Sequence, residues 1–196
     1  MFTKLLVANR GEIAVRIIRA CKEMGIRTVA VYSKADAESI HVALADEAIC
    51  IGEAAAKDSY LNQERIVSAA IASKAQAIHP GYGFLAENAS FANLCKKHGI
   101  AFIGPSGDLI ARMGDKDAAR RLMQQSGVPT IPGTEILEDA GAAKAAAEKI
   151  GYPVMLKASA GGGGKGIRLG RAPEEIEQAF NTASSEAQQA FGDGRV

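Results

Sequence analysis

The chain has no tryptophan, only three cysteines and almost no excess of charge of either sign. Its 196 residues carry 23 basic and 22 acidic side chains, for a formal net charge of +1. This balance excludes the basic surface on which nucleic acid binding depends. The cysteines stand far apart and form no CxxC pair. We therefore expect small buried thiols in a reducing compartment, with no disulfides.

Long hydrophobic runs are also missing. No apolar stretch is long enough to cross a bilayer. The N-terminal run "LLVA" (5–8) ends at Asn9 and is too short for the core of a signal peptide. The sequence therefore predicts a cytoplasmic protein that binds neither membranes nor nucleic acid.

Short apolar runs alternate with amphipathic segments over the first hundred residues. The apolar runs predict strands at 4–8, 27–33, 47–52, 77–80 and 100–105. Apolar residues at helical spacing predict helices at 11–25, 62–75 and 87–99. This alternation predicts an α/β domain, a Rossmann-like parallel sheet with helices on both faces.

The pattern changes after Pro105. Two helices are expected within 108–127, broken near Gly114, with Asp115 as the N-cap of the second. The two prolines of "VPTIPG" (128–133) favour a linker, so we place a domain boundary between about residues 105 and 130.

A second unit follows this boundary. A helix is expected near 140–150, strands at 153–158 and 166–170, and then a long helix opened by Pro173. The apolar stripe of that helix, expected to be buried, is Ile176, Phe180, Ala183, Ala187 and Phe191. Because a hairpin with one or two helices has little core, we expect the chain to be the front part of a longer enzyme.

The stretch "KASAGGGGKGIRLG" (157–170) holds six of the 21 glycines. It does not fit a Walker A loop, because Ser159 stands where the first glycine is needed and Gly166 where serine or threonine is needed. The GxGxxG pattern is met, but a strand follows instead of the helix that would bind a pyrophosphate.

A strand–loop–strand arrangement remains, in which glycine N–H groups fold over a polyphosphate. Lys157 ends the entering strand, and Lys165 and Arg168 add positive charge. A flexible linker is the alternative, but linkers seldom lie inside an apolar hairpin.

Five segments resemble the biotin carboxylases, members of the ATP-grasp superfamily that form a subunit or domain of acetyl-CoA, propionyl-CoA and pyruvate carboxylases. The segments are "LLVANRGEIAVRIIRACKEMGI" (5–26), "HPGYGFLAEN" (79–88), "FIGP" (102–105), "MGDK" (113–116) and "YPVMLKASAGGGGKGIR" (152–168). The resemblance implies an N-terminal α/β domain (1–114), a helical linker (115–130) and an incomplete ATP-grasp lid subdomain (131–196), ending before a large C-terminal domain.

The resemblance also implies an ATP-dependent ligase. Bicarbonate attacks the γ-phosphorus of ATP, carboxyphosphate releases CO₂, and N1′ of carrier-bound biotin is carboxylated. This is the first half-reaction of acetyl-CoA carboxylase, in fatty acid biosynthesis. The implied cofactors are ATP with Mg²⁺ or Mn²⁺, with biotin as the carrier-bound substrate. The implied partners are bicarbonate, a biotin carboxyl carrier protein, a carboxyltransferase and a second copy of the chain in a homodimer.

Particular residues match the family's motifs. Lys116 and Lys157 match lysines that hold ATP phosphates, and Tyr82 and Gly83 match a turn on the biotin side of the site. The residues that match the mobile lid are Gly161, Gly162, Gly163, Gly164 and Gly166. By themselves, Lys116 is typical of a solvated surface lysine and Tyr82 of a surface ring. The resemblance places the metal-binding glutamates, the arginine that orients bicarbonate and most of the adenine pocket after Val196.

Several other functions fit parts of the sequence. The chain could begin a multidomain pyruvate or propionyl-CoA carboxylase, or be a catalytically silent ATP-binding fragment. A carbamoyl phosphate or purine biosynthesis ligase is less compatible with "HPGYGFLAEN" (79–88). Asp36 stands where a dinucleotide-binding acid would, but the preceding "ANRGEIA" (8–14) lacks the glycine fingerprint. The final acyl acceptor is not determined by these residues.

Overall fold

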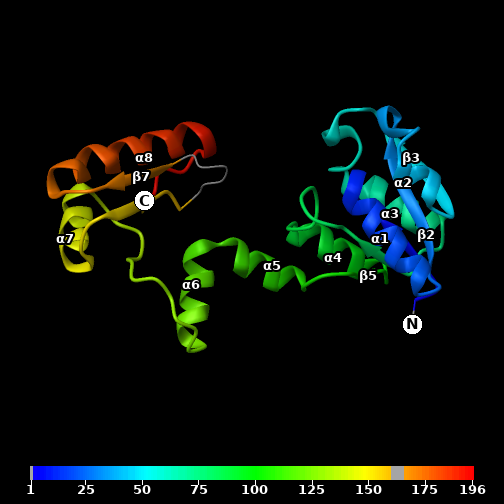
Figure 1. Cartoon of the computed structure of the whole chain (residues 1–196), viewed down its shortest axis with the longest axis horizontal. Coiled ribbons are helices and arrows are strands. Elements are labelled where there is room, and N and C mark those ends of the chain that lie inside the picture. Colours follow the sequence, from blue (N-terminus) through cyan, green and yellow to red (C-terminus); the bar gives the residue numbers. More distant parts are fainter. Residues whose placement is uncertain (1, 160–165) are drawn as a thin grey trace. The chain divides into compact units, whose positions relative to one another are not determined.

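A computed structural model of the chain describes residues 2–159 and 166–196, apart from the side chains of residues 116 and 117. Contacts within the chain divide it into two units, Met1–Gly114 and Asp115–Val196. Figure 1 shows the elements of each unit. No helix in the described ranges has both the length and the apolar character needed to cross a membrane.

The first unit contains a parallel sheet of five strands in the order β3-β2-β1-β4-β5. The strands are β1 (Lys4–Val7), β2 (Arg27–Ser33), β3 (Glu47–Gly52), β4 (Ala77–His79) and β5 (Ala101–Phe102). The parallel α/β architecture predicted from the sequence is confirmed.

Helices cover both faces of this sheet. They are α1 (Gly11–Glu23), α2 (Ile40–Leu44), α3 (Gln63–Ala72) and α4 (Ala89–Lys97), and α5 (Gly107–Gly114) packs on α4. Successive strand residues point to opposite faces. Leu5 and Val7 of β1 therefore pack with Ile18 of α1, whereas Leu6 packs in the other cluster with Ile66 of α3 and Phe91 of α4.

The strand order changes direction at β1. The chain continues from β1 to β2 on one side of it, and β4 returns to pair with β1 on the other side. The segments that follow β1 and β4 therefore leave the same edge of the sheet side by side. Such a switch point is where open α/β sheets bind their ligands.

The second unit is built around an antiparallel hairpin. Its elements are α6 (Lys116–Gln125), α7 (Ala140–Ile150), β6 (Val154–Lys157), β7 (Ile167–Gly170) and α8 (Ile176–Phe191). The core between the hairpin and helices α7 and α8 contains Ala147, Leu156, Ile176 and Phe180. The predicted pair of strands and the helix near 140–150 are confirmed. Pro173 opens a short 3₁₀ turn, Pro173–Glu175, directly before α8.

Two sequence-based expectations of burial are wrong. Cys50 is exposed, because β3 is an edge strand whose residues alternate between more and less exposed positions. Phe191 is 44% exposed at the last residue of α8. That helix is about 24 Å long, whereas a strand of four residues spans about 13 Å, so its last turn passes beyond the described end of the hairpin.

Candidate functional site

The turn after β4 lies at the switch point and carries Tyr82. Gly81 and Gly83 both have a φ of +68°, a left-handed conformation that glycine adopts without steric cost. Phe84 has a φ of +40°, which is strained for a residue with a Cβ atom. Its ring stacks on that of Tyr60, with centroids 5.1 Å apart. This packing holds the turn in its unusual backbone conformation.

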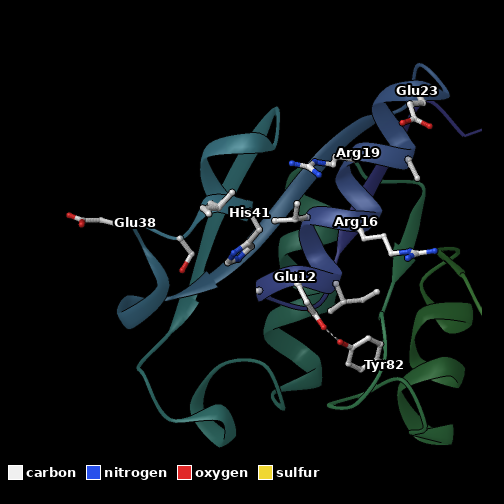
Figure 2. A pocket seen from close by; sticks show the side chains of 13 residues that line it. Glu12, Arg16, Arg19, Glu23, Glu38, His41 and Tyr82 are labelled. Atoms are coloured by element: carbon white, nitrogen blue, oxygen red, sulfur yellow. Dashed lines mark hydrogen bonds between the residues drawn. The ribbon is translucent and has the colours of Figure 1, made fainter.

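The Tyr82 side chain points toward the start of α1. It is 60% exposed, and its hydroxyl donates a hydrogen bond to the carboxylate of Glu12 in the first turn of that helix (Figure 2). Both residues line one end of an open groove of about 1140 Å³, which follows α1 past Arg19 and is bordered by Glu38 and His41. Tyr82 is therefore held at the carboxyl edge of the sheet while its ring remains accessible.

A charged cluster supports the same edge. The Asp36 carboxylate accepts hydrogen bonds of 2.7 Å from the hydroxyls of Ser33 and Tyr60. It also forms an ion pair with Arg10 at 3.4 Å. The Arg10 guanidinium lies over the rings of Tyr60 and Phe84, at 5.5 and 5.7 Å from their centroids. Asp36 is thus committed to contacts within the fold, in agreement with the rejection of a ribose-binding role.

The titration of Asp36 follows from these contacts. Burial by itself raises the pKa of this carboxyl, but hydrogen bonds from Ser33 and Tyr60 and the charge of Arg10 outweigh it and lower the pKa below 3.8. A carboxyl with a lowered pKa in the folded state stabilises the fold above its unfolded pKa. That contribution is lost as the pH falls below 3.8 and through the folded value.

We therefore expect Asp36→Asn to destabilise the protein by about 1.5–3 kcal/mol at pH 7, because a charged acceptor is lost. The difference from the wild type should shrink as the pH falls below 3.8 and through the folded pKa. Thermal unfolding of both proteins from pH 7 to about pH 2 measures it. Asp108→Asn, at an exposed position of α5, is the matched control. A difference that is independent of pH would contradict the ionised state assigned to Asp36.

The hairpin of the second unit has one open face. Met155, Ile167 and Leu169 are 56%, 39% and 41% exposed, although all three are large and apolar. Lys157 pairs with Ile167, and Met155 with Leu169, so these four side chains share the face opposite Leu156. An apolar surface with an exposed amine at its edge suits a flat apolar group that bears an anionic tail.

Gly166 lies directly before β7 and forms a hydrogen bond to α8. Its φ is +70°, and a Cβ atom there would lie 2.7 Å from that of Ala158. Its N–H donates to Glu186 Oε2 at 2.9 Å, and its carbonyl accepts the Ala158 N–H at 2.8 Å. Arg168 donates to the other oxygen of Glu186. The positive charge that Arg168 was expected to add near the glycines is therefore balanced by a carboxylate.

The remaining predicted residues are placed only in part. Gly161, Gly162, Gly163, Gly164 and Lys165 lie outside the described residues. Lys116 begins α6, and its side chain also lies outside the description. The expected cap of this helix is confirmed, since Asp115 Oδ1 accepts the Ala118 N–H at 2.8 Å. Within the described ranges, no group of three or more histidine, cysteine, aspartate or glutamate side chains is arranged to hold a metal ion.

Sequence reasoning missed two features of these surfaces. Asn9 and Arg10 contact the turn after β4, more than 70 residues away along the chain, and no local spacing reports such contacts. The open face of the hairpin was detectable, because Met155 and Lys157 alternate with the buried Leu156. Only Lys157 was singled out on that face.

Comparisons with known proteins cover both units. Residues 1–110 match the sequence profile of the biotin carboxylase N-terminal domain. Residues 115–196 match that of the carbamoyl-phosphate synthase L chain ATP-binding domain. Biotin carboxylase 1 of Bacillus subtilis (strain 168) is 58% identical over 197 residues, which cover 100% of this chain and 44% of that protein.

Two solved structures are also similar. A biotin carboxylase β-γ-ATP complex from Campylobacter jejuni is 50% identical with a TM-score of 0.91, over 100% of this chain and 44% of that one. The biotin carboxylase domain dimer of Hydrogenobacter thermophilus 2-oxoglutarate carboxylase, in complex with MgADP, ADP and bicarbonate, is 56% identical with a TM-score of 0.87, over 100% and 43%. The chain thus spans less than half the length of each of these proteins.

Proposed function

Because the chain belongs to the biotin carboxylase family, we propose that the protein containing it uses ATP and bicarbonate to carboxylate carrier-bound biotin. The observation that carries this proposal is the open hairpin face with Lys157 at its edge. It provides an apolar surface for a nucleotide base beside a cation for its phosphates. The relative from C. jejuni, crystallised as a β-γ-ATP complex, supports this assignment.

In this proposal the second unit binds ATP. Lys116 and Lys157 neutralise phosphate oxygens, which is the main requirement of phosphoryl transfer. The glycines Gly161, Gly162, Gly163 and Gly164 bring backbone N–H groups over the phosphates, and Gly166, whose N–H donates to Glu186, ends the loop. We assign 131–196 to a lid subdomain, with 115–130 as its helical linker. Exclusion of water by the lid would protect the carboxyphosphate from hydrolysis.

The first unit supplies the biotin side. Tyr82 and Gly83 lie on the exposed turn at the switch point, where a ring substrate can approach. A bicarbonate oxygen forms a bond to the γ-phosphorus of ATP. At the same time the bond between this phosphorus and ADP breaks. The resulting carboxyphosphate splits into CO₂ and phosphate, and N1′ of biotin gives its proton to the released phosphate as it attacks the CO₂.

Mg²⁺ or Mn²⁺, which the family implies, has no fitting set of ligands among the described residues. When bound, the metal neutralises charge on the ATP phosphates. We propose that its ligands and the residues that activate bicarbonate lie in the part of the full-length protein that corresponds to the uncovered part of these relatives.

We propose acetyl-CoA as the final acceptor, through a carboxyltransferase and a biotin carboxyl carrier protein, and hence a role in fatty acid biosynthesis. The H. thermophilus relative makes 2-oxoglutarate the alternative acceptor, and its description as a dimer supports a homodimer. The three free thiols and the use of ATP are consistent with the cytoplasm.

Isotope transfer tests the proposed reaction in the full-length protein. With bicarbonate labelled with ¹⁸O, each phosphate released from ATP should carry one labelled oxygen, because the bond that forms joins a bicarbonate oxygen to phosphorus. Hydrolysis should also depend on added biotin. Phosphate free of the label would mean that water attacks ATP, and would contradict the proposal. Absence of turnover would favour the silent ATP-binding fragment.

A further inference from the structure

Asn9 connects the two segments that meet at the switch point. It follows β1 by two residues and is only 4% exposed. Its side-chain Nδ2 donates to the carbonyl of Pro80 at 2.7 Å and to that of Tyr82 at 2.8 Å. Its Oδ1 accepts the N–H of Arg10 at 2.9 Å. The amide therefore uses both of its N–H donors on the turn after β4.

The turn is shaped to fit this amide closely. A Cβ atom on Gly81 would lie 2.8 Å from Asn9 Nδ2, so only glycine allows the backbone to approach this far. The N–H of Gly81 is in turn held by His79 Nδ1 at 3.0 Å. The position of the turn backbone is thus determined by a buried donor that follows a different strand.

Tyr82 is consequently fixed at two points by the segment that follows β1. Asn9 donates a hydrogen bond to its carbonyl. Glu12 accepts a hydrogen bond from its hydroxyl (Figure 2). The ring between these points is exposed. If Tyr82 served stability alone, its exposed ring would not need to be held at both its carbonyl and its hydroxyl.

We propose that Asn9 is a positioning residue for biotin, acting through the turn that carries Tyr82 and Gly83. This inference rests on the proposed function, since it takes biotin as the molecule that approaches the turn. Asn9 does not touch the substrate. It places the ring and the Gly83 backbone where biotin meets them, so its loss should weaken biotin binding and leave ATP binding in the other unit unchanged.

Asn9→Asp in the full-length enzyme is the decisive variant. It has nearly the same size but presents a carboxylate to two carbonyl oxygens, so both hydrogen bonds become repulsive. We expect the KM for biotin to rise at least about tenfold, because two buried hydrogen bonds are lost. The KM for ATP should stay within about twofold. Amides of residues 81–84 should exchange with deuterium at least about tenfold faster.

Asn88→Asp is the matched control. Asn88 caps α4 by accepting the Phe91 N–H at 2.9 Å, a role that a carboxylate retains. The KM of the Asn88→Asp variant for biotin should stay within about twofold of the wild type. If Asn9→Asp does not fold, Asn9→Ala removes the donors without adding charge, and the same selective rise in the KM for biotin is expected.

The outcomes separate the two proposals. A wild-type enzyme without biotin-dependent turnover would overturn the proposed function, and the assignment of Asn9 to biotin with it. Normal biotin dependence with an unchanged KM for biotin in the Asn9 variant would overturn the role of Asn9 alone. Equal increases in the KM for biotin and for ATP would also overturn it, because they would indicate a general structural defect.

Discussion

Replacing Lys157 with alanine should lower kcat/KM for ATP at least about 100-fold in the full-length enzyme, the usual cost of removing a fixed charge that stabilises a transition state. Lys157 is exposed at the end of β6 and contributes little to the core. The fold should therefore be retained. Bicarbonate-dependent release of phosphate from ATP measures the effect, and the circular dichroism spectrum checks the fold.

A matched control separates this effect from a general loss of positive charge. Lys149 is an exposed lysine in the last turn of α7 in the same unit, and Lys149→Ala should keep kcat/KM within about twofold of the wild type. Lys116→Ala should resemble Lys157→Ala. Were both Lys116→Ala and Lys157→Ala to keep the wild-type rate and KM for ATP, the phosphate-binding role of these lysines would be wrong.

The largest expected loss of stability is that of Phe91→Ala, about 3–5 kcal/mol in the free energy of unfolding. Phe91 is completely buried in the cluster beneath the sheet and packs edge-on against Phe102, with ring centroids 5.9 Å apart. Alanine would leave a cavity between α4 and the sheet. Native-state hydrogen exchange of the β1 and β4 amides reports the change within the first unit.

Phe2→Ala provides the comparison, because Phe2 is 37% exposed near the start of β1. Its effect should be about 0.5 kcal/mol. Similar losses in the two variants would show that Phe91 does not have the packing role assigned to it. A change confined to amides of α4 would mean that this helix opens independently of the sheet.

The local spacing of residues was sufficient to predict most elements of the fold. The apolar stripe of α1 and the short run of β1 each reflect a single element, so their signals lie within a few adjacent residues. By contrast, α2 has only five residues, too few for helical periodicity to be recognised. Phe191 was misassigned because periodicity shows which side of a helix is apolar but does not show how far its neighbour extends.

In the candidate site, too, residues in a local pattern could be predicted, whereas contacts between distant segments could not. Lys157 was recognised because it ends a strand a few residues before the glycines, which is a local pattern. The contacts of Asn9 with Pro80 and Tyr82 depend on which strands become neighbours. Predicting a parallel sheet does not by itself give its strand order, so these partners could not be chosen from the sequence.

The central place of β1 also has a consequence for biosynthesis. This strand leaves the ribosome before the other strands of its sheet, yet one of its two neighbours, β4, begins only at Ala77. Until that segment has emerged, one of the two hydrogen-bonding edges of β1 has no native partner. An unpaired edge favours chaperone binding or misassociation. The switch point between β1 and β4 therefore cannot form on the nascent chain until Ala77–His79 has emerged.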